Sequence, residues 1–238
     1  MLFRSAGIGS SDEPVSRVEI KKGLVAGYAK KEKPFVQRQA TAKSLMVSFT
    51  HSGRMVGVTM DIIASATAAS PADRKQWRFV RTGIGTEMKR ACEEAVRLQR
   101  GRYPVWPGRE CVSFSFGDKY SPKDGGSAGT AFALLLICLH DGIKLDAKTG
   151  ITGDITVDWK VRKVGGIPAK IKGAETAGLK RVAIPAANTD DVYDLVLLNG
   201  PEQLWKIQIY TISTLDEAVE TCRADRAAER LKAEQTFS

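Results

Sequence analysis

A single serine stands in a glycine-rich turn that leads into an apolar segment. The stretch KDGGSAGTA covers residues 123–131, and Ser127 lies where the turn meets a helix predicted over 128–140. Backbone N–H groups at the start of a helix have no intrahelical acceptor, and the positive end of the helix dipole lies there. Such a position can stabilise an oxyanion, but serine is also a favoured N-cap residue. The local sequence is therefore consistent with either role for Ser127, a nucleophile or a helix N-cap.

A serine nucleophile needs a general base. The two histidines, His51 and His140, have no recognisable setting for that role. A lysine can serve when burial and the positive end of a helix destabilise its ammonium form. Lys170 lies on the first turn of a predicted helix, after Gly-Gly-Ile-Pro-Ala, whereas Lys172 faces another side of that helix. Spacing alone does not choose a base among the 36 lysines and arginines.

Composition excludes several other kinds of site. The chain of 238 residues is 43% hydrophobic and 26% charged, as in ordinary globular proteins. It has no Gly-Lys dipeptide, so it lacks the Walker A motif. Its four cysteines form no CxxC pair and have no metal-ligand spacing, so we predict reduced, buried thiols, no metal and no cofactor.

The longest apolar run, residues 131–139, is too short to cross a bilayer, which takes about 20 residues. Residues 1–14 lack the apolar core of a signal peptide. We therefore expect a cytoplasmic protein with no membrane partner. The net charge is +9, and residues 17–43 hold much of it. Charge alone neither requires nor excludes nucleic acid, which is not an expected partner.

The order of elements predicts an α+β fold, because strands and helices alternate without a regular βαβ pattern. We expect Thr86 to cap the first helix and Thr152 to lie on the polar face of a strand. Residues 64–83 are expected to form a loop. The predicted strands cover 44–49, 55–63, 110–116, 151–157, 181–185 and 207–212, and the predicted helices cover 86–100, 128–140, 168–177, 189–198 and 214–222.

Four motifs, in this order, resemble the proteolytic domain of the Lon protease family. They are PKDGGSAG (122–129), ITGDIT (151–156), VRKVGGIPAK (161–170) and AGLKRVAIP (177–185). The resemblance is sharp over about 109–222 and weaker back to about residue 40. It implies a peptidase with a Ser-Lys dyad, in which Ser127 is the nucleophile and Lys170 is the general base.

The resemblance also implies supporting roles. Thr152 would hold the lysine amine by a hydrogen bond, Asp124 would shape or gate the site, and the backbone amides of Ser127 and Gly126 would form the oxyanion hole. The implied fold consists of small mixed sheets packed with helices. The implied reaction is acyl-enzyme hydrolysis of unfolded or short protein substrates, and the implied assembly is a homo-oligomer, a hexameric ring.

The resemblance divides the chain into a basic, partly flexible arm over 1–39, a Lon-like proteolytic domain over 40–222 and a charged tail over 223–238, helical or disordered. Gly126 stands where the family frequently has proline. No ATPase domain is present in this sequence, so we expect activity without ATP, a separate ATPase partner, or a fragment of a longer protein.

Two alternatives remain. One is a non-catalytic module of the same fold that serves assembly or nucleic-acid binding. The other is a subunit whose site another chain completes. Retention of both Ser127 and Lys170 favours the peptidase over the non-catalytic module.

Overall fold

The computed structural model describes residues 38–236, apart from 70–76, 81–82, 109 and 119–122. Residues 1–37, which make up almost all of the predicted basic arm, lie outside the described residues. In the described part of the chain, no helix combines the length and the apolar character needed to span a membrane.

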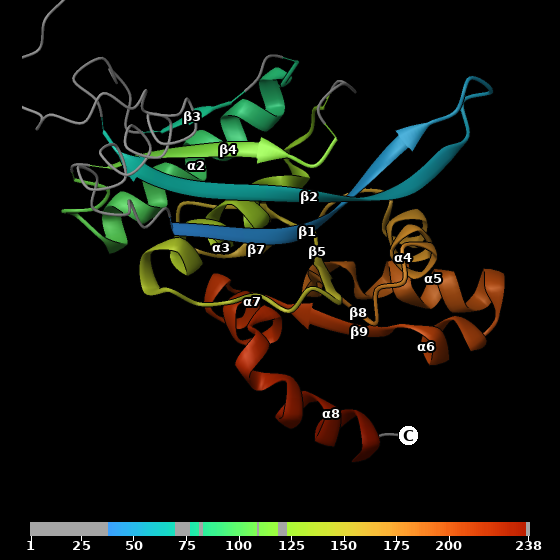
Figure 1. The fold of residues 1–238 in the computed structure, drawn as a ribbon. Helices are drawn as coiled ribbons and strands as arrows, with labels where there is room; N and C mark the ends of the chain where they lie inside the picture. Colours follow the sequence, from blue (N-terminus) through green and yellow to red (C-terminus); the bar gives the residue numbers. More distant parts are fainter. Residues whose placement is uncertain (1–37, 70–76, 81–82, 109, 119–122, 237–238) are drawn as a thin grey trace, which may run out of the picture. The chain divides into compact units, whose positions relative to one another are not determined.

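A mixed sheet of seven strands runs through the molecule in the order β3-β4-β2-β1-β5-β8-β9 (Figure 1). Strand β1 is antiparallel to β2 but parallel to β5, so the sheet changes from antiparallel to parallel pairing at β1. The strands are β1 (Arg38–Phe49), β2 (Met55–Ala68), β3 (Trp77–Phe79), β4 (Glu110–Phe116), β5 (Thr149–Ile151), β8 (Arg181–Pro185) and β9 (Gln208–Ile212). A separate two-stranded ribbon joins β6 (Asp154–Ile155) to β7 (Val161–Arg162).

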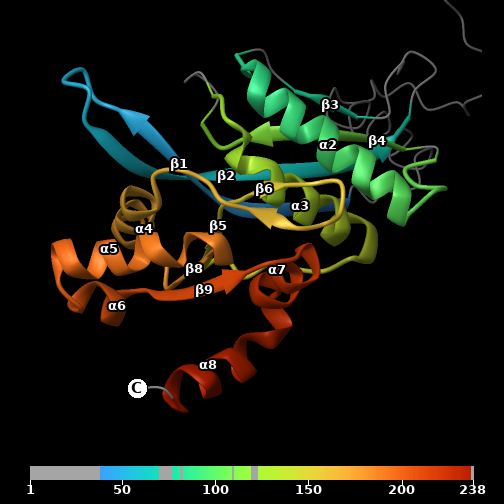
Figure 2. The ribbon, with the colours of Figure 1, turned by 180° about the vertical axis from the view of Figure 1, so that it is seen from behind.

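Helices cover both faces of the sheet (Figures 1 and 2). Helices α2, α3 and α7 share one apolar core with Met46 of β1, whereas α4 and α5 share a second core with the neighbouring Leu45. Successive side chains of a strand point to opposite faces, so β1 contributes to both cores. The helices are α2 (Thr86–Arg102), α3 (Gly129–Asp141), α4 (Ile167–Thr176), α5 (Thr189–Asn199), α6 (Glu202–Lys206), α7 (Leu215–Cys222) and α8 (Ala227–Thr236).

Helix α3 is the centre of the larger core. Every residue from Gly129 to Leu139 is buried, which explains why its sequence is apolar on all sides instead of on one stripe. Burial of each leucine, isoleucine or phenylalanine stabilises the fold by about 1.5–3 kcal/mol. The segment that begins beside Ser127 is therefore firmly fixed.

The predicted α+β class is confirmed, and strands β4 and β8 have the predicted bounds. The predicted packing of mixed sheets with helices is confirmed as well, with one sheet of seven strands and one of two. The loop predicted over 64–83 is wrong where β2 continues to Ala68 and where Trp77–Phe79 form β3. Residues 70–76 and 81–82 of that loop lie outside the described residues. Ala64 and Ala66 are small, buried and paired with both β1 and β4, so tertiary packing outweighs their low strand propensity.

The strand predicted over 151–157 is wrong as well, because the chain leaves β5 after Ile151 and enters β6 at Asp154. Gly153 has φ +159°, and a Cβ at this position would lie 2.6 Å from the Thr130 hydroxyl oxygen on α3. The chain can therefore pass this close to α3 only with glycine there. The break in the strand lies at Thr152 and Gly153.

Candidate active site

Ser127 lies in a short 3-10 turn, η1 (Gly126–Ala128), that leads directly into α3. The N-cap of α3 is Ala128, and the side chain of Ser127 makes no capping hydrogen bond at either helix start. The helix-cap role considered for Ser127 is therefore wrong. The amides of Gly126 and Ser127 belong to the first turn, where backbone donors have no intrahelical acceptor.

The backbone of Ser127 is hydrogen-bonded to the residues that connect β5 and β6. Its carbonyl oxygen accepts a 3.0 Å hydrogen bond from the Gly153 amide and a 3.3 Å hydrogen bond from the Thr152 hydroxyl. The Thr152 amide in turn donates to the carbonyl of Ala183 on β8. The serine is thus held against the sheet through Thr152 and Gly153, while its own side chain is not used in that contact.

Lys170 meets the same threonine from the other face of the sheet. Its amine donates a 3.0 Å hydrogen bond to the Thr152 hydroxyl oxygen, which accepts from Lys170 and donates to the Ser127 carbonyl. Thr152 is fully buried and Lys170 is 1% exposed. Within the described residues, the hydrogen bond of the Lys170 amine goes to Thr152 and not to the Ser127 hydroxyl.

Burial lowers the pKa of Lys170 from 10.5 to about 8. The cause is desolvation, which penalises the charged form of an amine taken out of water. A pKa near 8 leaves roughly a tenth of the amine neutral at pH 7, about 300 times the fraction for an ordinary lysine. Lys172, the other lysine of this helix, is exposed to solvent.

Helix α4 carries Lys170 because its start is fixed by two residues with special backbone properties. Gly166 is the N-cap and has φ +74°, and Pro168 occupies the first turn. Proline suits that turn because its missing N–H would have no intrahelical acceptor. The predicted turn-helix around VRKVGGIPAK is confirmed.

Close backbone contact between β2 and α4 fixes the position of α4, and with it Lys170, relative to the sheet. A Cβ at Gly57 would lie 1.8 Å from the carbonyl oxygen of Ala169, and a Cβ at Gly173 would lie 2.3 Å from the Gly57 backbone. Both positions accept only glycine if the helix is to stay where it is. Sequence reasoning missed Gly57, although a glycine inside the strand-like MVGVTMDII is a signal for close backbone approach.

Asp124 links the serine turn to α2. Its carboxylate accepts hydrogen bonds from the amides of Met88 (3.0 Å) and Gly125 (2.8 Å). These hydrogen bonds, to Met88 first and Gly125 second, lower the pKa of Asp124. The helix therefore begins with Gly85 as N-cap and with a carboxylate from another segment, and the predicted cap Thr86 is wrong.

An open pocket of about 360 Å³ lies beside Gly126. Helix α2 forms one wall, and the β6–β7 ribbon, which includes Asp154, forms the other. Burial raises the pKa of Asp154, whose carboxylate accepts the Ile155 amide. Asp154 belongs to the ITGDIT motif, but the sequence alone predicts no role for it. The charged residues of the lining are Glu87, Arg90, Glu94, Asp154 and Arg162.

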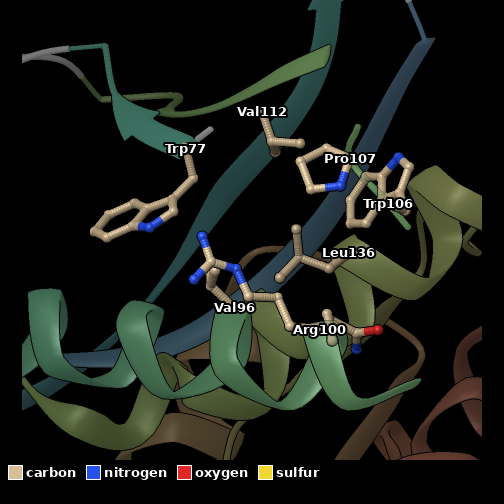
Figure 3. A pocket seen from close by; sticks show the side chains of 8 residues that line it. Trp77, Val96, Arg100, Trp106, Pro107, Val112 and Leu136 are labelled. Atoms are coloured by element: carbon tan, nitrogen blue, oxygen red, sulfur yellow. The ribbon is translucent and has the colours of Figure 1, made fainter. Parts of the chain in front are cut away.

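A second pocket, between α2, α3 and β4, is apolar and does not belong to this site. Figure 3 shows Arg100 reaching into the space between Trp77 and Leu136. The free volume is only about 10 Å³, the room for roughly one water-sized sphere. Neither Ser127 nor Lys170 lines it.

Comparison with known proteins shows which family this chain resembles. A family model described as the Lon protease (S16) C-terminal proteolytic domain matches residues 110–223. The archaeal Lon protease of Archaeoglobus fulgidus is 32% identical over 172 residues, which cover 71% of this chain. That of Thermococcus kodakarensis is 28% identical over 174 residues, which cover 73% of this chain. Residues 110–223 belong to the Lon proteolytic-domain family.

The Lon-type domain is much shorter than these relatives. The matched region covers 26% of each archaeal protein, and 17% of the Lon protease of Clostridium beijerinckii, which is 34% identical over 143 residues. The chain thus spans about a quarter of the length of its archaeal relatives. Ser127, Thr152 and Lys170 all lie inside the part that matches the Lon family model.

Proposed function

We propose that this Lon-type domain is a serine endopeptidase in which Ser127 is the nucleophile and Lys170 is the general base. One observation carries the proposal: a buried lysine with a pKa of about 8 is hydrogen-bonded to Thr152, which also binds the backbone of Ser127. A base with a pKa near the working pH is the most effective in proton transfer. Membership of the Lon family supports the same assignment.

The proposed reaction has two halves. In the first, the neutral Lys170 amine takes the hydroxyl proton of Ser127 as its oxygen attacks the substrate carbonyl, and then gives that proton to the leaving amine. In the second, Lys170 takes a proton from water, which attacks the acyl-enzyme, and returns the proton to Ser127. The amides of Gly126 and Ser127 would hold the oxyanion in both halves.

Thr152 and Asp124 have positioning roles in this proposal. Thr152 holds the Lys170 amine by a hydrogen bond, and in the proposed reaction the amine leaves the threonine hydroxyl for the Ser127 hydroxyl. Asp124 holds the turn before Ser127 by its hydrogen bonds to Met88 and Gly125. Neither role requires a metal or a cofactor.

The substrates are proposed to be unfolded or short polypeptides, as the resemblance to Lon proteolytic domains implies. The open pocket beside Gly126 adjoins the serine turn, although neither Ser127 nor Lys170 lines it. We further propose that hydrolysis by this domain proceeds without ATP, because the proposed acyl-enzyme chemistry uses only Ser127, Lys170 and water. A separate ATPase partner would extend the range to folded substrates. A homo-oligomer in the cytoplasm is the proposed working state.

The test is digestion of unfolded casein by the purified chain, with and without ATP. Lys170→Met should abolish cleavage, whereas Lys172→Met, on the exposed side of the same helix, should leave it unchanged. Full cleavage by Lys170→Met would refute the assignment of the base. Salt-sensitive binding of DNA without cleavage under any condition would instead support the non-catalytic module.

A further inference from the structure

The open pocket beside Gly126 is lined by charged side chains that only partly neutralise one another. Glu87 and Arg90 form an ion pair of 3.0 Å on α2. Asp154 of β6 and Glu94 of α2 make no ion pair within the part of the chain that the structure describes. Two carboxylates without a cationic partner there therefore line the same cavity of about 360 Å³.

Burial separates the two signs of charge in this pocket. Asp154 and Glu94 are half-buried, whereas Arg90 and Arg162 are exposed to solvent. Water and salt screen an exposed charge more strongly than a half-buried one. Burial raises the pKa of Asp154, and repulsion from Glu94 raises it further, while Arg162 opposes the rise. The more buried part of the pocket is therefore anionic, and the cations lie toward solvent.

The pocket also has apolar lining, to which Ala91, Ile155 and Val157 contribute. A lysine or arginine side chain matches this combination, because its aliphatic stem packs on apolar surface and its cationic end is attracted to carboxylates. Nowhere in the described residues do three or more histidine, cysteine, aspartate or glutamate side chains form a group that could hold a metal ion. The donor set of the pocket therefore suits an organic cation better than a metal ion.

The pocket lies next to the serine turn. Gly126 lines it and directly precedes Ser127 in the chain. A Cβ at Gly126 would lie 3.7 Å from Oδ1 of Asp154, so the carboxylate is adjacent to the turn. A substrate side chain in this pocket would thus come from a residue near the bond that Ser127 attacks.

We propose that this pocket is a substrate subsite for a lysine or arginine side chain close to the cleaved bond, with Asp154 and Glu94 as its specificity-determining residues. The inference rests on the proposed function, in which Ser127 is the nucleophile of a peptidase. Binding pockets commonly set specificity through a few polar groups in this way. A substrate with an acidic side chain at the same position is disfavoured by repulsion from the two carboxylates.

The test uses two matched series of fluorogenic peptides. One series has a single lysine at successive positions around the cleaved bond, and the other has norleucine, an uncharged side chain of similar length, at the same positions. At one position, wild type should cleave the lysine peptide with a kcat/KM roughly tenfold above that of the norleucine peptide, as for one hydrogen bond to a charged group.

Glu94→Gln and Asp154→Asn should each reduce this lysine preference by about threefold or more, because each removes one carboxylate charge. Both variants should cleave the norleucine peptide like wild type. Glu93→Gln is the matched control, since Glu93 is exposed beside Glu94 on α2 and does not line the pocket. This control should keep the full preference. Circular dichroism checks that all three variants are folded.

The possible failures are distinguishable. Equal cleavage of lysine and norleucine peptides by wild type at every position would overturn the subsite and leave the peptidase proposal standing. An unchanged lysine preference in both Glu94→Gln and Asp154→Asn would also overturn it. Cleavage of neither series by wild type would overturn the proposed function, and the subsite with it.

Discussion

The amine of Lys170 lies 3.0 Å from the hydroxyl oxygen of Thr152, and both side chains are buried. Lys170 comes from a helix on one face of the sheet, and Thr152 follows the end of β5 in the sheet itself. From the other face, η1 brings the backbone of Ser127 to the same threonine. Thr152 is thus the residue at which α4, the sheet and the serine turn meet.

Thr152→Val should lower kcat by roughly 10–100-fold, because the lysine loses the acceptor that directs its amine. The substrate does not contact Thr152 in our account, so KM should change little. Thr152→Ser keeps the hydroxyl and should restore most of the activity. Steady-state kinetics on a fluorogenic peptide measures both constants. Equal losses in the valine and serine variants would contradict the positioning role.

The pH dependence of hydrolysis should report the pKa of Lys170, which is about 8. A general base acts only when it is neutral, so kcat/KM should fall about tenfold for each pH unit below that pKa and level off above it. The measurement is a profile from about pH 6 to about pH 9.5. A profile that stays flat through pH 8 would contradict Lys170 as the base.

Lys170→Met should stabilise the fold at neutral pH while it removes activity. Because desolvation places the folded-state pKa of Lys170 below its unfolded value, the folded protein carries a buried, desolvated ammonium at any pH below about 8. A lowering from 10.5 to about 8 corresponds to about 3 kcal/mol of lost stability.

That loss disappears as pH rises toward 10.5, where the unfolded lysine also becomes neutral. In urea unfolding at neutral pH, Lys170→Met should therefore have a larger free energy of unfolding than wild type. At alkaline pH the two free energies should become equal. The exposed Lys172→Met is the control and should show no such trend. Destabilisation by Lys170→Met at pH 7 would refute the argument from burial.

Gly57→Ala should reduce activity even though Gly57 lies on β2, far along the sequence from the motifs. The new Cβ would lie 1.8 Å from the Ala169 carbonyl oxygen, so α4 and Lys170 must move. Gly165→Ala is the control, because its Cβ would meet nothing within 4 Å. Thermal unfolding and casein digestion should show lower stability and activity for Gly57→Ala than for Gly165→Ala. Wild-type behaviour of Gly57→Ala would show that the contact is not needed.

The sequence alone predicted most helices and strands around the site motifs, because these elements depend on local residue patterns. Pro168 and the glycines before it predict a helix start, and the apolar run after Ser127 predicts a buried helix. The roles of Ser127 and Lys170 came from resemblance to the Lon family and stay a prediction.

The sequence could not predict contacts between distant segments. Asp124 caps a helix that begins far from it in the chain, and Thr152 breaks a strand because Gly153 must approach Thr130. The full length of β2 also escaped prediction, since Ala64 and Ala66 have low strand propensity and lie in a strand that pairs with both β1 and β4. Each of these features depends on tertiary packing and leaves no periodic pattern in the sequence.

The most direct test of the central claim is to trap the acyl-enzyme. The chain is incubated with an activated peptide ester, quenched in acid and mapped by mass spectrometry. Our account predicts one acyl group on Ser127, absent in Ser127→Ala and strongly reduced in Lys170→Met. Ser52→Ala, a change at an exposed serine in the β1–β2 turn, should label like wild type. Acylation at another residue, or undiminished peptide hydrolysis by Ser127→Ala, would contradict the account.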